Sequence, residues 1–359
     1  MIQAIRSLWD DFRGAGAAAL SVPSMDGAFR PNQNLEEAPV ALACDRPDNV
    51  TVAGGRVYLS SGARVLALTG PGTAEVAADG DAPVTAMAGL PDGTLAVARS
   101  GAGAVLAVDP QGRGAGRIYG AGMADITAMA FADDGALALA VGSARFRAAD
   151  WRHDLMHPGQ SGSVWLAPLS GAAPQRLAEG LRYAGGIAPA GPGRFVVSET
   201  WASRLVTVGQ GAPAPVLSGL PAYPWRIAPA TGGGCWVAFL APRNQLIELV
   251  LRDRAFRGRM VAELDPEYWI APMLRPSDQP LDPMLKGVQR VSGSEPKPWG
   301  SSLSWGLVAR IGADFVPDFS HHSRANGKRH GFTSAAEHDG RLLATSHCGF
   351  VVSLPVDQR

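Results

Sequence analysis

Short runs of alternating apolar and polar residues recur along the chain, and each is broken by a glycine-containing turn. The first run, residues 50–52, turns at Gly54-Gly55 into residues 56–59, and the second, residues 85–90, turns at Asp92-Gly93 into residues 94–98. Four further copies turn at Gly135, Gly193, Gly234 and Gly340. Alternation with a period of two around Asp-Gly or Gly-Gly predicts a β-hairpin in each copy.

Most copies add a third strand, such as residues 64–68, and often a fourth, such as residues 75–78. Four short antiparallel strands repeated about every forty residues are typical of a β-propeller blade. Six copies predict an all-β protein, a six-bladed β-propeller that forms one domain over residues 38–359 after an N-terminal extension at 1–37. The last blade has three C-terminal strands, and we expect its fourth from residues 38–43, which closes the ring and removes unpaired edges.

Two insertions interrupt this repeat, at residues 145–160 in blade three and at 243–302 in blade five. In the larger one, apolar residues at near-helical spacing predict a helix over 244–264. A proline-rich irregular stretch follows at 265–299, and strands resume at 305–311 and 315–320. Long loops of this kind are usually functional or disordered, so the insertion is a candidate lid over one face of the propeller. The alternative is that its aromatic residues only cover a blade edge.

Composition excludes several classes of protein. The 359 residues include 32 Lys and Arg against 32 Asp and Glu, and 46% are hydrophobic while 18% are charged. Zero net charge argues against a nucleic-acid binder, the apolar content argues against disorder, and no apolar run reaches the roughly 20 residues of a membrane span. Three cysteines without a CxxC pair argue against a disulfide framework or a cysteine zinc site. We expect a cytoplasmic protein, with secretion left open because residues 15–22 are weakly apolar.

Several motifs, in order along the chain, resemble one family. They are Tyr-Ala-Gly-Gly-Ile-Ala at 183–188, Phe-Val-Val-Ser-Glu-Thr-Trp at 195–201, Gly-Leu-Pro-Ala-Tyr-Pro at 219–224 and Arg-His-Gly-Phe-Thr-Ser at 329–334. Over residues 40–357 the chain resembles the strictosidine synthase-like group, which consists of six-bladed propellers related to the gluconolactonase/regucalcin and paraoxonase families. The resemblance implies a small organic molecule as substrate, bound at the mouth of the central channel.

The resemblance also bears on metals. Related lactonases hold Ca²⁺ at the channel mouth with oxygen ligands from several blades. Of the corresponding positions here, Asp48 keeps a carboxylate, whereas the others are Ala124, Gly185-Gly186 and Trp225-Arg226. Arg226 would place a positive charge where the cation binds, so we expect no metal and no other cofactor, with Ca²⁺ disfavoured. The proton-transfer glutamate of strictosidine synthase falls at Thr333, which cannot act as a base at neutral pH.

Two residues are catalytic candidates. His330 could be a general base, because imidazole titrates near neutral pH, or it could fix a loop through a carbonyl. Asp48 could activate water. Six residues are candidates for substrate binding: Trp225, Arg226, Asp125, His321, Trp201 and Tyr183. Arg226 offers a fork of donors to a carboxylate, but it could instead plug the channel by pairing with Asp48 or Asp125.

Three functions remain open from the sequence. The first is a metal-independent lactone or ester hydrolase, the second an amine–carbonyl condensing enzyme or lyase, and the third a non-catalytic ligand-binding or scaffold propeller. Fold alone does not decide among them. A channel closed by an Arg226–Asp48 pair would favour binding, and an open pocket lined by Trp225, Arg226, Asp48 and His330 would favour an enzyme. Protein partners and oligomeric state are not indicated.

Overall fold

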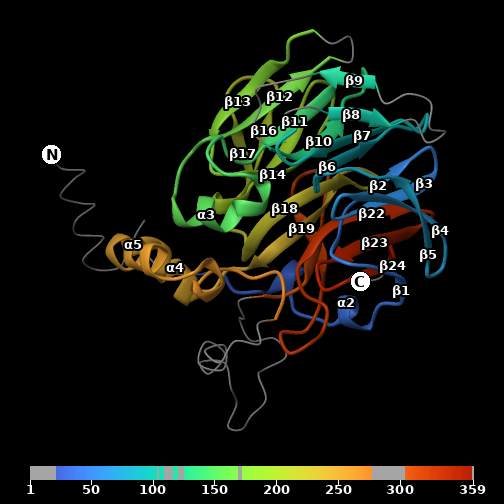
Figure 1. Cartoon of the computed structure of the whole chain (residues 1–359). Coiled ribbons are helices and arrows are strands. Elements are labelled where there is room, and N and C mark those ends of the chain that lie inside the picture. Colours follow the sequence, from blue (N-terminus) through green and yellow to red (C-terminus); the bar gives the residue numbers. More distant parts are fainter. Residues whose placement is uncertain are drawn as a thin grey trace.

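The computed structural model describes residues 22–102, 105–108, 116–119, 125–168, 172–276 and 304–357. This part of the chain forms six four-stranded antiparallel sheets arranged around a common centre (Figure 1). The first strands of neighbouring sheets contact one another in the closed order β2, β6, β10, β14, β18 and β22. These six strands therefore line the central channel, and the predicted all-β propeller class is confirmed.

Five blades are continuous, each with four strands in sequence order from the channel outward. Blade one has β2 (Pro47–Ala53), β3 (Arg56–Ser61), β4 (Arg64–Gly70) and β5 (Thr73–Ala78), and blade two has β6 (Val84–Gly89), β7 (Leu95–Arg99), β8 (Val105–Val108) and β9 (Gly116–Tyr119). Blade three has β10 (Ile126–Phe131), β11 (Leu137–Val141), β12 (Gly162–Ala167) and β13 (Gln175–Leu181). Blade four has β14 (Ala184–Pro189), β15 (Phe195–Glu199), β16 (Arg204–Val208) and β17 (Ala214–Leu217). Blade five has β18 (Ala222–Pro229), β19 (Cys235–Pro242), β20 (Leu307–Ile311) and β21 (Pro317–His322).

The remaining sheet is composite. It joins β22 (Phe332–His338), β23 (Arg341–Ser346) and β24 (Phe350–Pro355) to β1 (Val40–Ala43) from the other end of the chain. The prediction of a six-bladed repeat is corrected in this respect: only five blades are continuous four-stranded units of the chain, and this sixth sheet is a closing sheet built from both ends. Val40 pairs with Val352 and Ala43 with Phe350, so the strand expected at 38–43 does complete the last sheet.

Packing between blades explains why the inner strands are buried on both faces. Every residue of β11 is buried, as are the first four residues of β7, since neighbouring blades cover both faces of each sheet. Alanines such as Ala96, Ala98, Ala138 and Ala140 alternate with larger residues in these strands and are at most 1% exposed. Their small side chains let adjacent blades approach closely, as close-packed interiors require.

The insertions carry the helices. The smaller one holds η3 (Ala148–Asp150) and α3 (Trp151–Met156), and the larger one holds α4 (Gln245–Arg252), α5 (Arg254–Glu263) and η5 (Pro266–Tyr268). The single helix predicted over 244–264 is wrong, because Asp253 breaks it with an extended backbone and caps α5 by accepting from the Phe256 amide at 2.9 Å. Residues 277–303, which include most of the predicted irregular stretch, lie outside the described residues.

Three shorter helices complete the described fold: η2 (Gly27–Phe29), α2 (Asn34–Glu37) and η4 (Thr200–Ala202). Of these, η2 and α2 belong to the expected N-terminal extension, and both contact β21 on the outside of blade five. No helix in the described ranges is long and apolar enough to cross a membrane.

Candidate functional site at the mouth of the channel

One end of the channel gathers the unusual segments of the chain. In an antiparallel blade, the connection from the second to the third strand lies at the same end as the segment that enters the first strand. The connections that hold α3, η4 and α4 with α5 are all of this type, in blades three, four and five. They therefore meet at one face of the ring, which we call the mouth, and α3 and α4 lie beside each other there (Figure 1).

An ion pair crosses the channel at this level. Arg226 on β18 donates from Nε and Nη2 to the two carboxylate oxygens of Asp48 on β2, at 3.1 and 2.8 Å. The same guanidinium donates to the backbone oxygen of Thr85 on β6, at 3.0 Å, and to that of Thr127 on β10. Arg226 thus ties blade five to blades one, two and three. The Arg226 and Asp48 side chains remain 13% and 25% exposed.

The electrostatics of the pair keep Asp48 charged. Burial alone would raise the pKa of Asp48, but the charge and hydrogen bonds of Arg226 and the amide of Asn49 together lower it below the ordinary value. A carboxylate held in this way is a weak base at neutral pH. Its main effect is to fix the position of the Arg226 guanidinium.

These residues do not fit a calcium ion. Calcium would need the Asp48 carboxylate and neighbouring carbonyl oxygens as ligands, and Arg226 already uses both carboxylate oxygens together with two backbone carbonyls. A guanidinium therefore supplies the positive charge from within the chain. The position of Ala124 lies outside the described residues, and the metal-free expectation stays a prediction.

Three of the predicted substrate-binding residues come together in an aromatic cluster. The Tyr183 ring lies 5.4 Å from that of Trp225 and 5.0 Å from that of Trp201, measured between centroids. Trp151 of α3 and Trp269 of the large insertion pack onto the same cluster. Tyr183, Trp201 and Trp225 are only 1%, 8% and 6% exposed. Their rings therefore form a packed wall of the mouth rather than an open surface.

Polar groups are built into this wall. The Trp201 indole donates to the Asp154 carboxylate of α3 at 2.8 Å, and burial raises the pKa of Asp154. The Tyr183 hydroxyl is buried and has no hydrogen-bond partner among the described residues. Burial also raises the pKa of Tyr183, so this hydroxyl keeps its proton and can only be a neutral donor or acceptor.

Asp125 does not pair with Arg226. Its carboxylate accepts from the Ser100 hydroxyl at 2.8 Å, the Gly101 amide at 2.6 Å and the Ala148 amide at 3.0 Å. It therefore joins the second blade to the insertion of the third. The expected role of Asp125 in substrate binding stays a prediction, since these contacts already account for its oxygens.

The structure does not bring the two predicted histidines to the ion pair. His330 is 1% exposed, and its ring nitrogens contact the Ser304 hydroxyl at 2.5 Å and the Gly327 carbonyl at 3.2 Å. His321 lies on β21, the outer strand of blade five, where it stacks on Trp236 at 5.8 Å. Burial lowers the pKa of His321 to about 4. His321 is thus buried in blade five and His330 in the connection that enters β22, and their predicted roles stay predictions.

A different histidine, His347, lies near the ion pair. It occupies the turn between β23 and β24, another connection at the mouth, where its amide donates to the Gly331 carbonyl at 2.9 Å. Burial lowers the pKa of His347, and the nearby Asp48 carboxylate opposes this change. The residue as a whole is partly exposed, and its ring makes no hydrogen bond to the described residues. His347 was not identified as a candidate from the sequence, although its place in a second-to-third strand turn of the repeat would have put it at the mouth.

Comparisons with known proteins agree with the fold. No protein-family model and no curated protein matches the sequence. Among solved structures, a gluconolactonase from Xanthomonas campestris is 15% identical with a TM-score of 0.55, and the match covers 89% of this chain and 88% of that one. A calcium-binding regucalcin from Agrobacterium tumefaciens is 10% identical with a TM-score of 0.54, covering 88% and 92%. These neighbours are propellers of the gluconolactonase/regucalcin type, and at such identities they establish the fold alone. The finer resemblance to the strictosidine synthase-like group stays a prediction.

Proposed function

We propose that the protein is a metal-independent hydrolase of a lactone or ester of a small organic molecule, acting at the mouth of the channel. The observation that carries this proposal is the Arg226–Asp48 pair, partly exposed at the mouth, with the His347 imidazole near it and without a hydrogen-bond partner in the described part of the chain. The fold it shares with a gluconolactonase adds support by analogy.

His347 is the proposed general base. Its lowered pKa keeps the imidazole neutral at pH 7, so a ring nitrogen can accept a proton from water. The water oxygen attacks the carbonyl carbon and the ester C–O bond breaks. The leaving alkoxide then takes the proton from the imidazolium, giving a carboxylic acid and an alcohol, which in a lactone belong to one molecule.

Arg226 is the proposed electrophile. A guanidinium has five N–H donors, and four of its bonds go to Asp48, Thr85 and Thr127. One donor remains for the carbonyl oxygen of the substrate, where negative charge develops. Asp48 is then a positioning residue, because it holds the guanidinium and does not itself contact the reacting atoms.

The test is hydrolysis of aryl esters and of five- and six-membered lactones by the purified chain, with and without chelator. We expect activity that survives chelation and falls by at least about a hundredfold in His347→Gln, as loss of a general base predicts. His338→Gln is the matched control, since His338 lies at the opposite end of β22, beside Asp339 at 3.3 Å. Activity that requires Ca²⁺, or that survives in His347→Gln, contradicts the proposal.

A ligand-binding propeller is the second candidate, and one observation favours it. The four hydrogen bonds of Arg226 span four blades, an arrangement that also suits a permanent structural plug. In that case no ester or lactone is turned over, and Arg226→Met lowers only the stability of the fold. The same panel of substrates therefore separates the two candidates.

A further inference from the structure

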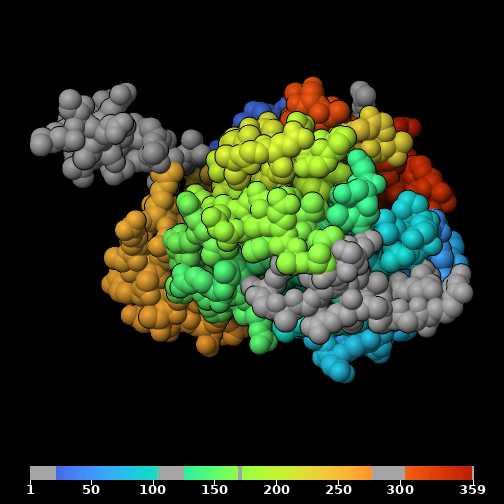
Figure 2. Space-filling model, turned by 90° about the horizontal axis from the view of Figure 1, so that it is seen from above, coloured from blue at the N-terminus to red at the C-terminus, as the bar shows by residue number. Residues whose placement is uncertain are grey.

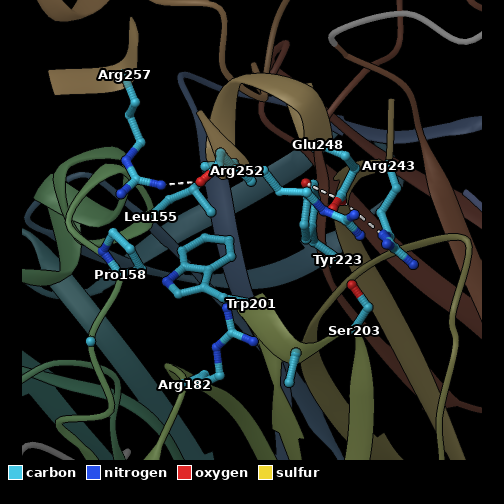
Figure 3. Close-up of a pocket in the computed structure, with 13 residues that line it drawn as sticks. Leu155, Pro158, Arg182, Trp201, Ser203, Tyr223, Arg243, Glu248, Arg252 and Arg257 are labelled. Carbon is cyan, nitrogen blue, oxygen red and sulfur yellow. Dashed lines mark hydrogen bonds and ion pairs between the residues drawn. The ribbon is translucent and has the colours of Figure 1, made fainter. Parts of the chain in front are cut away.

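A cavity lies beside the mouth, between η4 of blade four and the helices of the large insertion. It encloses about 340 Å³, and its lining includes Arg182, Arg243, Arg252, Arg257, Trp201 and Tyr223. Figure 3 shows Arg182 and Arg257 approaching Trp201 from different sides. Trp201 belongs to the aromatic cluster as well, so the cavity and the cluster share this indole.

The charge of this cavity is unbalanced. Among the described lining residues, Glu248 is the one carboxylate, and it is already used: the Arg243 guanidinium and the Tyr223 hydroxyl both donate to it at 2.9 Å. The Arg182 side chain has no ion-pair partner in the described ranges, and Arg257 donates to the backbone oxygen of Leu251 (Figure 3). These two guanidiniums therefore line the cavity without forming an ion pair in the described ranges, and the one carboxylate that acts on Arg257, Asp253, is not part of the lining.

A neighbouring cleft is also lined by arginines. It holds about 590 Å³ between α3 and α5 and shares Pro158 and Arg257 with the first cavity. Arg145 and Arg254 also line it, and the described lining contains no carboxylate. Burial lowers the pKa of Arg257, the charge of Arg254 lowers it further, and the nearby Asp253 carboxylate opposes this change. In Figure 2 the helices of the insertion (orange) border the blade-three segment (green) along this side.

We propose that these two clefts, together called the arginine groove, bind a small organic phosphate. Arg182 and Arg257 hold the phosphate, while its organic part lies against Trp201 and Leu155. Guanidinium forks match the oxygens of a phosphate, which carries nearly two negative charges at neutral pH. A dianion balances two guanidiniums that form no ion pair in the described ranges, whereas a monocarboxylate pairs with only one of them. The apolar side chains give the organic part a surface that inorganic phosphate cannot use.

The experiment is isothermal titration of the full-length chain with phenyl phosphate, inorganic phosphate and benzoate at low ionic strength. We expect phenyl phosphate to bind more tightly than inorganic phosphate, and benzoate to bind most weakly. Arg182→Gln and Arg257→Gln should each lower the affinity for phenyl phosphate roughly tenfold, which is the usual effect of losing one charge-assisted hydrogen bond. Binding should weaken as salt is added.

Arg194→Gln is the matched control. Arg194 is exposed in the turn between β14 and β15, a first-to-second strand connection at the opposite face of the ring, and its loss should not change the affinity. The proposal is overturned if phenyl phosphate does not bind, or if benzoate binds as tightly as phenyl phosphate. It is also overturned if all three variants lose the same amount of affinity. The titration measures binding without turnover, so its outcome is independent of whether the protein hydrolyses an ester.

Discussion

Replacing Arg226 with methionine tests the central claim that a guanidinium organises the channel. Methionine keeps the unbranched side chain and much of its volume but removes every donor. The substitution leaves Asp48 charged without a paired cation, next to the Asn49 amide at 2.8 Å and the Thr333 hydroxyl. It also leaves the carbonyls of Thr85 and Thr127 without the bonds that Arg226 donates. We therefore expect a loss of stability well above that of a surface ion pair.

The magnitude follows from burial. Removing one partner of a fully buried pair costs about 3–5 kcal/mol, whereas an exposed pair contributes about 1 kcal/mol or less. Because the Asp48 side chain is 25% exposed, water can solvate it in part. Two carbonyls lose their donors at the same time. Together these effects predict a decrease of about 2–4 kcal/mol in the free energy of unfolding at pH 7.

Urea unfolding followed by far-UV circular dichroism measures this loss. In the double variant Asp48→Asn with Arg226→Met, the uncompensated charge is gone, so we expect part of the stability to return, with a coupling of about 2 kcal/mol in the mutant cycle.

The stabilisation by the pair should also depend on pH. The pKa of Asp48 is lowered in the folded protein, so the pair stabilises fully above the ordinary aspartate pKa of about 3.9, and this contribution is lost as pH falls through the folded value. A loss below about 1 kcal/mol with no coupling would refute the reasoning, since exposed pairs behave in that way.

Three further predictions concern other parts of the molecule. Gly186→Ala should destabilise the fold by about 1–3 kcal/mol, because the new Cβ would collide with the Trp225 backbone oxygen. Gly258→Ala should instead stabilise the fold slightly, because this glycine lies in α5 with open space around it. Urea unfolding of the two variants measures both effects. Burial lowers the pKa values of His321 and His322 to about 4 and about 3. The free energy of unfolding should therefore fall by about 2 kcal/mol between pH 7 and pH 5.5, because there the unfolded state takes up two protons that the folded state does not. An equally steep fall in a variant with glutamine at both positions would contradict this. If His347 is the base, kcat/KM should rise with pH through a value below 6.5 and then level off, and an inflection above pH 7 would exclude it.

The sequence predicted the all-β propeller class, because its signals are local and repeated, but the prediction of six repeated blades was wrong, since only five are continuous units of the chain. Alternating residues around turn glycines define each hairpin independently of the others, and the strand at 38–43 was expected because a ring needs its last edge paired. The large insertion was harder. The predicted helix breaks at Asp253. Aspartate is a strong N-cap residue but can also stand inside a helix, so the spacing of apolar residues alone could not distinguish one helix from two.

The candidate site could be predicted only in part. The contact between Arg226 and Asp48 was foreseen as one of two pairings, because a cation at that position needs an acidic partner across the channel. The direction of a single side chain was not foreseeable. His330 immediately precedes the turn into β22, and its ring bonds to Ser304 and Gly327, whereas Asp125 bonds to amides of neighbouring connections. Such contacts depend on where loops from different blades meet, which no local pattern encodes.

The closing sheet has a consequence for how the chain folds. Pairing Val40 with Val352 joins segments more than three hundred residues apart, and closing a flexible loop of that length costs roughly 5 kcal/mol in chain entropy. Once the five continuous blades have formed, they bring the two ends together and most of that cost has already been met. We therefore expect β1 to dock last, and until it does, the free edge of β24 can pair with the same strand of another molecule. Slow refolding at high protein concentration should then yield exchanged dimers, in which β1 of each chain completes the ring of the other.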